Sequence, residues 1–421
     1  MIKAILDRPV PATVLVLAAL LATTSGVLYS PRSIVIFMLF QGSILLLYFA
    51  RIPAHLKAAI TALALGLLMP WLGTINAYYM EIAIQVGIFV ALALGLNIVV
   101  GLAGLLDLGY VAFFAVGAYS WAIFGSPQAN LIFGGSYFPL GPWWFFVFLL
   151  VGVAVAAGAG FLLGLPVLRL HGDYLALVTL GFGEVIRVLA NNLDKPINLT
   201  NGPKGITPIT RPPLFFVPVL QAIGIDPDPN VIYPLYLYAL VLLIVGATVL
   251  ANRRLEDSHI GRAWEAIRED QTAAQAMGVP LVRMKLLAFA CGASFAGTVG
   301  VLFSAKQIFI NPESFTFMES IGVLAMIILG GMGSIPGAIL GAAVVTILNL
   351  QILKGLSLWL NELRNAGTVI FGYSLTNLPT QLEPAKYERM VFGLILVLMM
   401  IFRPQGILPA RRRHRELGEE S

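Results

Sequence analysis

The chain has 421 residues, of which 58% are hydrophobic and only 11% are charged, whereas about a quarter of the residues in a soluble domain are charged. A soluble protein of this composition would expose large apolar patches and aggregate, so the outer surface is predicted to face membrane lipid. The net charge of +5 reflects membrane topology in such a chain and does not indicate a nucleic-acid partner.

The sequence also excludes several kinds of chemistry. The single cysteine, Cys291, excludes a disulfide framework and a cysteine-based zinc site. The four histidines, at positions 55, 171, 259 and 414, are too far apart in the sequence to form a metal-ligand pair. No phosphate-binding GxxxxGKS/T motif occurs, and no nucleophile is paired with a base. The chain is therefore predicted not to be an enzyme, to bind no metal or cofactor, and to need another polypeptide for any ATP hydrolysis.

The apolar segments, read in chain order between charged residues, predict an all-α bundle with about ten to twelve membrane spans, since about 20 apolar residues cross the hydrocarbon core as a helix. The segment 174–189 is less apolar because it carries Glu184 and Arg187, so it is predicted to be half-buried in the bundle or re-entrant. The other candidate spans cover residues 10–30, 33–50, 58–75, 82–106, 108–124, 143–168, 231–251, 286–305, 320–331, 335–353 and 390–402.

Basic residues beside the spans predict the orientation of the chain, because cytoplasmic loops are enriched in lysine and arginine. Six basic residues lie between residues 252 and 285, and four more lie in the tail after Arg403. Both segments, and both termini, are predicted to be cytoplasmic. The proline-rich segment 191–230 is then an irregular outer loop, and 355–389 is a second outer segment.

Two glycine-rich stretches, at 101–117 and 330–341, fall in corresponding halves of the chain. Small residues let helix backbones approach closely where lipid gives no hydrophobic drive for association. The two stretches are compatible with an internal structural repeat, which transporters often have. They are equally compatible with ordinary tight packing of helices.

The segment 258–280 is charged in a chain that avoids charge almost everywhere else. Ser258 is placed to cap a helix, several alanines favour that helix, and Gly278 and Pro280 are placed to end it. An apolar stripe at helical spacing is formed by Trp264, Ile267, Ala274 and Met277. Such a helix either lies on lipid headgroups or docks its apolar face on a soluble partner. The near-balance of positive and negative charges favours the partner.

Three further features lie in or beside the predicted spans. Asp107 is predicted to lie at a membrane boundary, because a charge buried in the membrane is costly. Glu184 and Arg187 lie one helical turn apart and are predicted to form a structural ion pair that faces the bundle. In the sequence LVTLGFGE, the residues predicted to expose backbone to a translocation path are Thr179, Gly181 and Gly183.

The chain resembles a known family over residues 86–409. The motif GRAWEAIREDQTAAQAMG, at residues 261–278, resembles the cytoplasmic loop of permeases in the branched-chain amino acid family of ABC importers. Other stretches resemble the M-type permease of the Liv system, at residues 104–119, 172–187, 312–317, 329–334 and 403–408. At residues 200–206 the family usually has paired glycines after the threonine, and Asn201 stands in place of the first.

The resemblance implies a permease subunit that forms the path for leucine, isoleucine, valine or a related amino acid together with a second, homologous permease. Two separate ATPase subunits would bind beneath it, and a periplasmic binding protein would deliver the substrate. The segment 258–280 would be the coupling helix on which the ATPase docks, through Gly261, Arg262, Trp264, Glu265, Ile267, Arg268, Ala274, Met277 and Gly278. The apolar side chains of Trp264, Ile267 and Met277 would supply the docking area, and the charged ones its orientation.

The chain is thus predicted to have three parts in the inner (plasma) membrane: N-terminal transmembrane helices at 1–85, a permease core at 86–409, and a basic and acidic cytoplasmic tail at 410–421. The alternative is a stand-alone, ion-coupled secondary transporter of amino acids. Such a transporter would need carboxylates within the membrane, of which the sequence offers few. It would also leave the charged segment 258–280 without a role.

Overall fold

The computed structural model describes an all-α protein, as the composition predicted. The described residues are 9–30, 33–50, 52–167, 170, 172–215, 217, 221, 228–365, 369–370, 373–374, 384–403 and 406–408. Within them the strands are two short segments, β1 (Val369–Ile370) and β2 (Tyr373–Ser374), which pair antiparallel. The predicted tail at 410–421 lies outside the described residues.

Nine helical stretches in the described part of the chain are long and apolar enough to cross a membrane. In chain order they are α2 (Pro9–Tyr29), α4–η1–α5 (Ala54–Leu63, Ala64–Leu68 and Met69–Ile75), α6–η2 (Ala77–Leu96 and Asn97–Leu102), α9 (Trp144–Val167), α10 (Asp173–Asn192), α12 (Pro229–Glu256), α15 (Leu281–Gln307), η4–α16 (Pro312–Phe315 and Phe317–Gly330) and α17–η5–α18 (Ile335–Ile347, Leu348–Leu353 and Lys354–Asn365).

The remaining described helices are shorter. Three are apolar and coincide with predicted spans: α3 (Ile34–Phe49), α7 (Val111–Phe124) and α19 (Glu388–Phe402). The others lie between spans: α8 (Gln128–Phe133), η3 (Gly202–Lys204), α13 (His259–Glu269), α14 (Gln271–Ala276) and η8 (Pro384–Tyr387). The predicted bundle of membrane-spanning helices is therefore confirmed.

Two details differ from the sequence predictions. α10 is one uninterrupted helix of 20 residues, long enough to cross a membrane, so the re-entrant alternative for 174–189 is wrong. The span predicted at 335–353 continues through η5 into α18. The first part of the predicted outer segment 355–389 is therefore helical.

The helices group into two compact units. Unit 1 comprises residues 1–85, 215–240 and 347–388, and unit 2 comprises residues 86–214, 241–346 and 389–421. The boundary after Gln85 coincides with a predicted domain boundary, but two later segments group with the N-terminal helices. The two units are defined by contacts between residues. The predicted division into N-terminal helices, permease core and tail is a division by function, and it stays a prediction. Every predicted site residue lies in unit 2.

Unit 1 is joined by close helix contacts and buried aromatic rings. A side chain on Gly26 would lie 2.9 Å from Cγ2 of Ile36, so α2 and α3 approach closely. The rings of Phe37 and Tyr79 stack with their centroids 3.9 Å apart. The Oη of Tyr238 donates a hydrogen bond to the carbonyl oxygen of Leu65 (3.0 Å), which ties the segment 215–240 to the N-terminal helices.

The core of unit 2 consists of α7, α9 and α15, which meet along glycines. A side chain on Gly117 would overlap the backbone of Gly297, and one on Gly297 would overlap the carbonyl oxygen of Gly152. Glycine lets three backbones approach this closely. α16 and α17 also approach closely at glycines, since a side chain on Gly330 would overlap the carbonyl oxygen of Gly337. Both glycine-rich stretches therefore pack helices.

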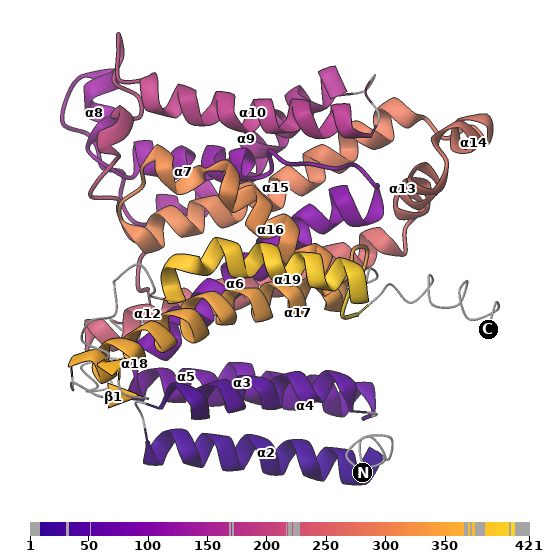
Figure 1. Ribbon diagram of the computed structural model, residues 1–421. Helices are drawn as coiled ribbons and strands as arrows, with labels where there is room; N and C mark the ends of the chain where they lie inside the picture. Colours follow the sequence, from indigo (N-terminus) through magenta and orange to yellow (C-terminus); the bar gives the residue numbers. More distant parts are fainter. Residues whose placement is uncertain are drawn as a thin grey trace. The chain divides into compact units, whose positions relative to one another are not determined.

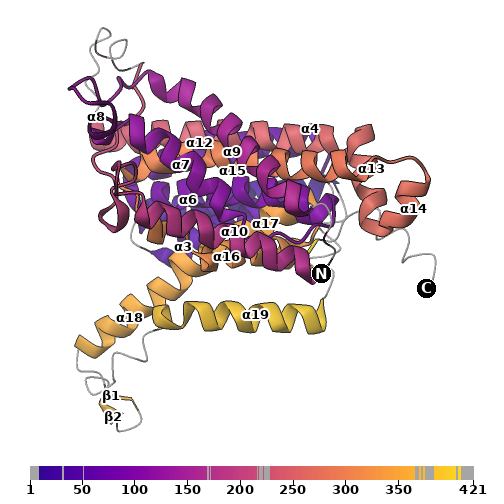
Figure 2. The ribbon, with the colours of Figure 1, turned by 90° about the horizontal axis from the view of Figure 1, so that it is seen from above.

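The two ends of unit 2 differ in structure. Figures 1 and 2 both show α13 and α14 at one end of its helices and α8 at the other. At the α8 end, Ile206 pairs with Ile310, and the N–H of Thr210 donates to the carbonyl oxygen of Gly125 (2.6 Å). Asn201 in this loop has a φ of 59°. Asparagine tolerates that left-handed conformation better than most residues.

Candidate functional site

The α13–α14 segment (residues 258–280) forms one end of unit 2 (Figure 1). Ser258 caps α13 as predicted, because its Oγ accepts a hydrogen bond from the N–H of Gly261 (3.2 Å). Gly261 is a close-contact position, since a side chain there would lie 2.7 Å from the carbonyl oxygen of Glu256. The chain can therefore turn sharply from α12 into α13.

The segment contains two helices where one was predicted, and Asp270 causes the break. Its backbone is extended, and its Oδ1 accepts hydrogen bonds from the N–H groups of Thr272 (2.7 Å) and Ala273 (3.0 Å). A side-chain acceptor satisfies N–H groups that have no partner in the first turn of a helix. Gly278 then turns the chain toward α15 with a φ of 87°, which glycine adopts without strain.

The apolar stripe of the segment faces the chain itself. Trp264 is 0% exposed, Ile267 1% and Ala274 4%. The Nε1 of Trp264 donates a hydrogen bond to the carbonyl oxygen of Met284 in α15 (2.8 Å). The chain's own helices therefore cover Trp264 and Ile267, and a role for these two side chains in docking a partner stays a prediction. Met277 differs from these residues and is 86% exposed.

The three charged residues predicted to orient a partner lie in different surroundings. Arg262 is exposed, and its η1 nitrogen donates to the carbonyl oxygen of Asp257 (3.1 Å). Glu265 is half-buried. Arg268 points into the chain, where its η1 nitrogen donates to the carbonyl oxygen of Gly101 (2.6 Å). Arg262 and Glu265 can contact a partner, whereas Arg268 is engaged within the fold.

The segment presents outward a mostly polar face (the polar face), formed by Arg262, Glu269, Asp270, Thr272, Gln275 and the apolar Met277, which are all exposed. This face carries one positive and two negative charges, whereas helices that lie on lipid are rich in lysine and arginine. Methionine and arginine are both enriched where proteins bind one another. The chemistry of the face therefore suits a soluble protein partner.

The three residues predicted to line a path lie on different sides of α10. Thr179 is fully buried, and its Oγ1 accepts a hydrogen bond from the N–H of Leu108 (3.0 Å). A side chain on Gly183 would lie 3.2 Å from Cα of Gly109, so Gly183 also packs on the segment before α7. Thr179 and Gly183 thus hold α10 against this segment, and their place in a path stays a prediction. Gly181 has open space beside it, and its place in a path stays a prediction.

Asp107 lies in the non-helical segment 103–110, between η2 and α7. It was predicted at a membrane boundary, but it is fully buried inside the protein. Its Oδ1 accepts a hydrogen bond from the N–H of Gly109 (2.9 Å), while its Oδ2 has no partner within the described part of the chain. The Asp107 carboxylate therefore stabilises a turn in a segment that lacks the backbone hydrogen bonds of a helix.

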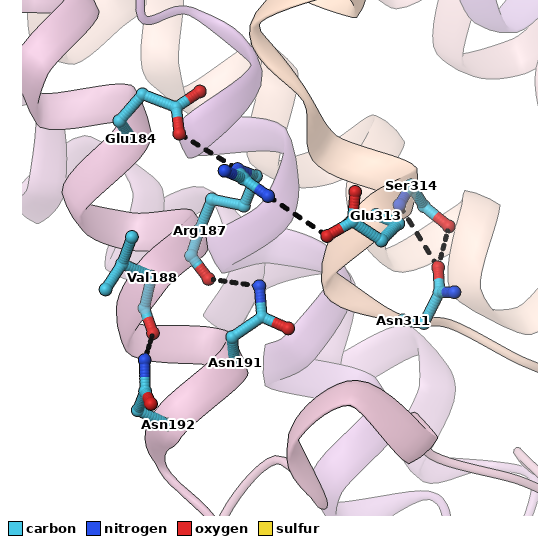
Figure 3. Close-up of polar contacts among 8 residues, drawn as sticks. All are labelled: Glu184, Arg187, Val188, Asn191, Asn192, Asn311, Glu313 and Ser314. Carbon is cyan, nitrogen blue, oxygen red and sulfur yellow. Dashed lines mark hydrogen bonds and ion pairs between the residues drawn. The ribbon is translucent and has the colours of Figure 1, made fainter.

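A charged cluster joins α10 to η4 (Figure 3). The predicted ion pair is confirmed, with Nε of Arg187 2.9 Å from Oε2 of Glu184. The η1 nitrogen of Arg187 also lies 3.0 Å from Oε1 of Glu313, a partner that no local pattern could indicate because 126 residues separate the two. The Glu313 side chain is 61% exposed, so this ion pair contributes at most about 1 kcal/mol. The cluster therefore contributes more to the orientation of α10 relative to η4 than to the stability of the fold.

Comparison with known proteins gives the family. Residues 78–400 match the family described as branched-chain amino acid transport system, permease component. The high-affinity branched-chain amino acid transport system permease protein LivM of Salmonella typhimurium is 40% identical over 356 residues, which cover 81% of this chain and 72% of the relative. The LivM protein of Escherichia coli K12 is 39% identical over 362 residues, which cover 83% of this chain and 74% of the relative.

A shorter similarity extends to the LivH permease protein of the same kind of system in Escherichia coli K12. It is 30% identical over 151 residues, which cover 36% of this chain and 40% of the relative. No solved structure matches the chain. The family match includes the whole α13–α14 segment and most of the membrane-spanning helices. The chain therefore belongs to the family of permease components of branched-chain amino acid transport systems, and it is a multi-pass membrane protein.

Proposed function

We propose that the chain is the membrane-spanning subunit of an ATP-driven importer of leucine, isoleucine and valine. The observation that carries the proposal is the polar face of the α13–α14 segment, which a chain of the permease family presents at one end of unit 2. The sequence has no nucleotide-binding motif, so an importer built on it needs a separate ATPase. The exposed Arg262 and Met277 of the polar face are of the residue types enriched at protein interfaces.

The proposed importer contains a second permease, two ATPase subunits and a periplasmic binding protein. The likeness to LivM over most of the chain and to LivH over about a third supports a pair of homologous permeases. ATP would bind to the ATPase subunits, and this chain would bind no cofactor. The binding protein would deliver the amino acid to the α8 end of unit 2.

The α13–α14 segment and both termini are proposed to be cytoplasmic, in an inner membrane. The six basic residues between 252 and 285 support this orientation, because basic loops remain on the cytoplasmic side. The proline-rich loop after α10, at the other end of unit 2, would then face the outside.

The alternative, a stand-alone secondary transporter, is disfavoured by the family. In a permease subunit the α13–α14 segment would serve as the docking surface, whereas a stand-alone transporter would have no use for one. The buried carboxylate of Asp107 is already engaged by Gly109 in a turn, and Glu184 is engaged by Arg187.

Uptake by reconstituted vesicles tests the proposal. The chain alone in liposomes should take up no leucine on an ion gradient, while the chain with the second permease, the ATPases, the binding protein and ATP should take it up. A matched complex with the phosphate-binding lysine of the ATPase replaced should be inactive. Leucine uptake by the chain alone, without ATP, would contradict the proposed function.

A further inference from the structure

We infer that Arg268 is a positioning residue that passes movement of α13 into the non-helical segment 103–110, and through it to α10 and α16. The inference rests on the proposed function, in which an ATPase moves the α13–α14 segment. It deepens that function by naming the residues that carry the movement inside this chain.

Arg268 joins α13 to the end of η2. Its η1 nitrogen lies 2.6 Å from the carbonyl oxygen of Gly101, a charge-assisted hydrogen bond, which is stronger than a neutral one. Carbonyl groups in the last turn of a helix have no partner within that helix, and the negative end of the helix dipole favours a cation there. Arg268 therefore makes α13 and the end of η2 move together.

Two glycines bring other backbone segments against Arg268. A side chain on Gly104 would lie 2.7 Å from Cγ of Arg268, and one on Gly333 would lie 3.0 Å from its η1 nitrogen. The N–H of Gly333 in turn donates to Oδ1 of Asn97 (2.9 Å). Arg268 thus lies where the turn after η2 meets the turn between α16 and α17. The two glycine-rich stretches of the sequence come together at this side chain.

The far end of the segment 103–110 contacts two other helices. The N–H of Leu108 donates to Oγ1 of Thr179 in α10 (3.0 Å), and the N–H of Val111, the first residue of α7 directly after the segment, donates to Oγ of Ser320 in α16 (3.2 Å). The segment is therefore attached to α13 at one end and to α10 and α16 at the other.

These attachments suit the transmission of movement. Non-helical backbone inside a membrane protein is tolerated where the protein supplies partners for its polar groups. Gly101, Thr179 and Ser320 are buried, and water cannot replace their partners there, so displacement at Gly101 is passed on through the segment to Thr179 and Ser320. Proximity alone does not establish coupling between two sites, so the test measures coupling itself.

The test compares ATP hydrolysis and leucine uptake in vesicles that hold the complete importer with Arg268→Ala. Hydrolysis should stay within about twofold of wild type, while the leucine imported per ATP falls about tenfold, the size expected for losing one charge-assisted hydrogen bond. Arg268→Lys, which keeps a cationic donor, should recover part of the ratio. Arg254→Ala, the same change at an exposed arginine at the end of α12, should alter neither quantity.

A second measurement follows α10 directly. Gly181→Cys in a Cys291→Ala background places one thiol on the open side of α10. ATP should change the rate at which a water-soluble reagent labels that thiol when Arg268 is present, and should have no effect with Arg268→Ala.

The possible outcomes separate the two proposals. If the wild-type importer needs ATP but Arg268→Ala keeps the wild-type ratio of leucine to ATP, the inference fails and the proposed function stands. Loss of hydrolysis and uptake together would also overturn the inference, because Arg268 would then only hold the fold. Uptake by the wild-type chain without ATP would overturn the proposed function itself.

Discussion

Replacing Gly297 with leucine is expected to leave almost no folded protein in the membrane. Any side chain at this position would overlap the carbonyl oxygen of Gly152 in α9 and the Cβ of Ala156. Overpacking typically costs about 1–3 kcal/mol when neighbouring side chains can move. Here the main neighbour is backbone, which cannot rotate away, so α7, α9 and α15 would have to separate. A domain whose whole stability is about 5–15 kcal/mol does not survive the loss of its central contact.

The measurement is the yield of monodisperse protein after detergent extraction, together with its midpoint of thermal unfolding. Gly158→Leu is a matched control in α9, because a side chain there meets nothing within 4 Å. That variant should give wild-type yield and midpoint. Equal behaviour of the two variants would contradict the packing of α7, α9 and α15 through glycine.

Replacing Trp264 with alanine is expected to detach the α13–α14 segment from the rest of the isolated chain. The side chain is 0% exposed and its Nε1 bonds to the carbonyl oxygen of Met284. Truncating a buried tryptophan to alanine costs about 3–5 kcal/mol, which exceeds what the short helices α13 and α14 can supply on their own. Hydrogen exchange of the backbone amides at 258–285 should therefore become much faster.

Trp264→Phe is the control for this experiment. It keeps most of the buried apolar surface and removes the one hydrogen bond to Met284, so it should cost about 1 kcal/mol. The result also separates two roles for the stripe. If Trp264 served only to dock an ATPase, the alanine variant would show unchanged exchange in the isolated chain and would weaken binding of the partner.

The fold was predictable from the sequence where the cause is local. A membrane-spanning helix satisfies its own backbone hydrogen bonds, so an apolar run of sufficient length predicts a span without knowledge of its neighbours. The cap at Ser258 and the pair of Glu184 and Arg187 are also local, since each joins residues three apart. The break at Asp270 had a local cause as well. The sequence did not predict this cap, because the neighbouring alanines favour a continuous helix.

The rest of the site depends on contacts that are distant in sequence. An apolar stripe predicts that one face of a helix is covered, but it does not identify the cover. The stripe therefore suggests that a partner covers Trp264, whereas in the structure α15 covers it. In the same way, nothing near Arg268 indicates that its partner is the carbonyl oxygen of Gly101, 167 residues away. Small residues such as Thr179 and Gly183 likewise suit a path and a close helix contact equally well.

The central claim is that the polar face of the α13–α14 segment docks a separate ATPase. Its most direct test is a photoactivatable cross-linker attached to Met277→Cys in a Cys291→Ala background, within the complete importer. Met277 is 86% exposed on that face, and Tyr137, which follows α8 at the opposite end of unit 2, is 85% exposed and provides the matched control. Illumination should join the Met277→Cys chain to the ATPase subunit and leave the Tyr137→Cys chain free of it. Cross-links from Met277→Cys to lipid alone, or ATPase cross-links from both positions alike, would contradict the claim.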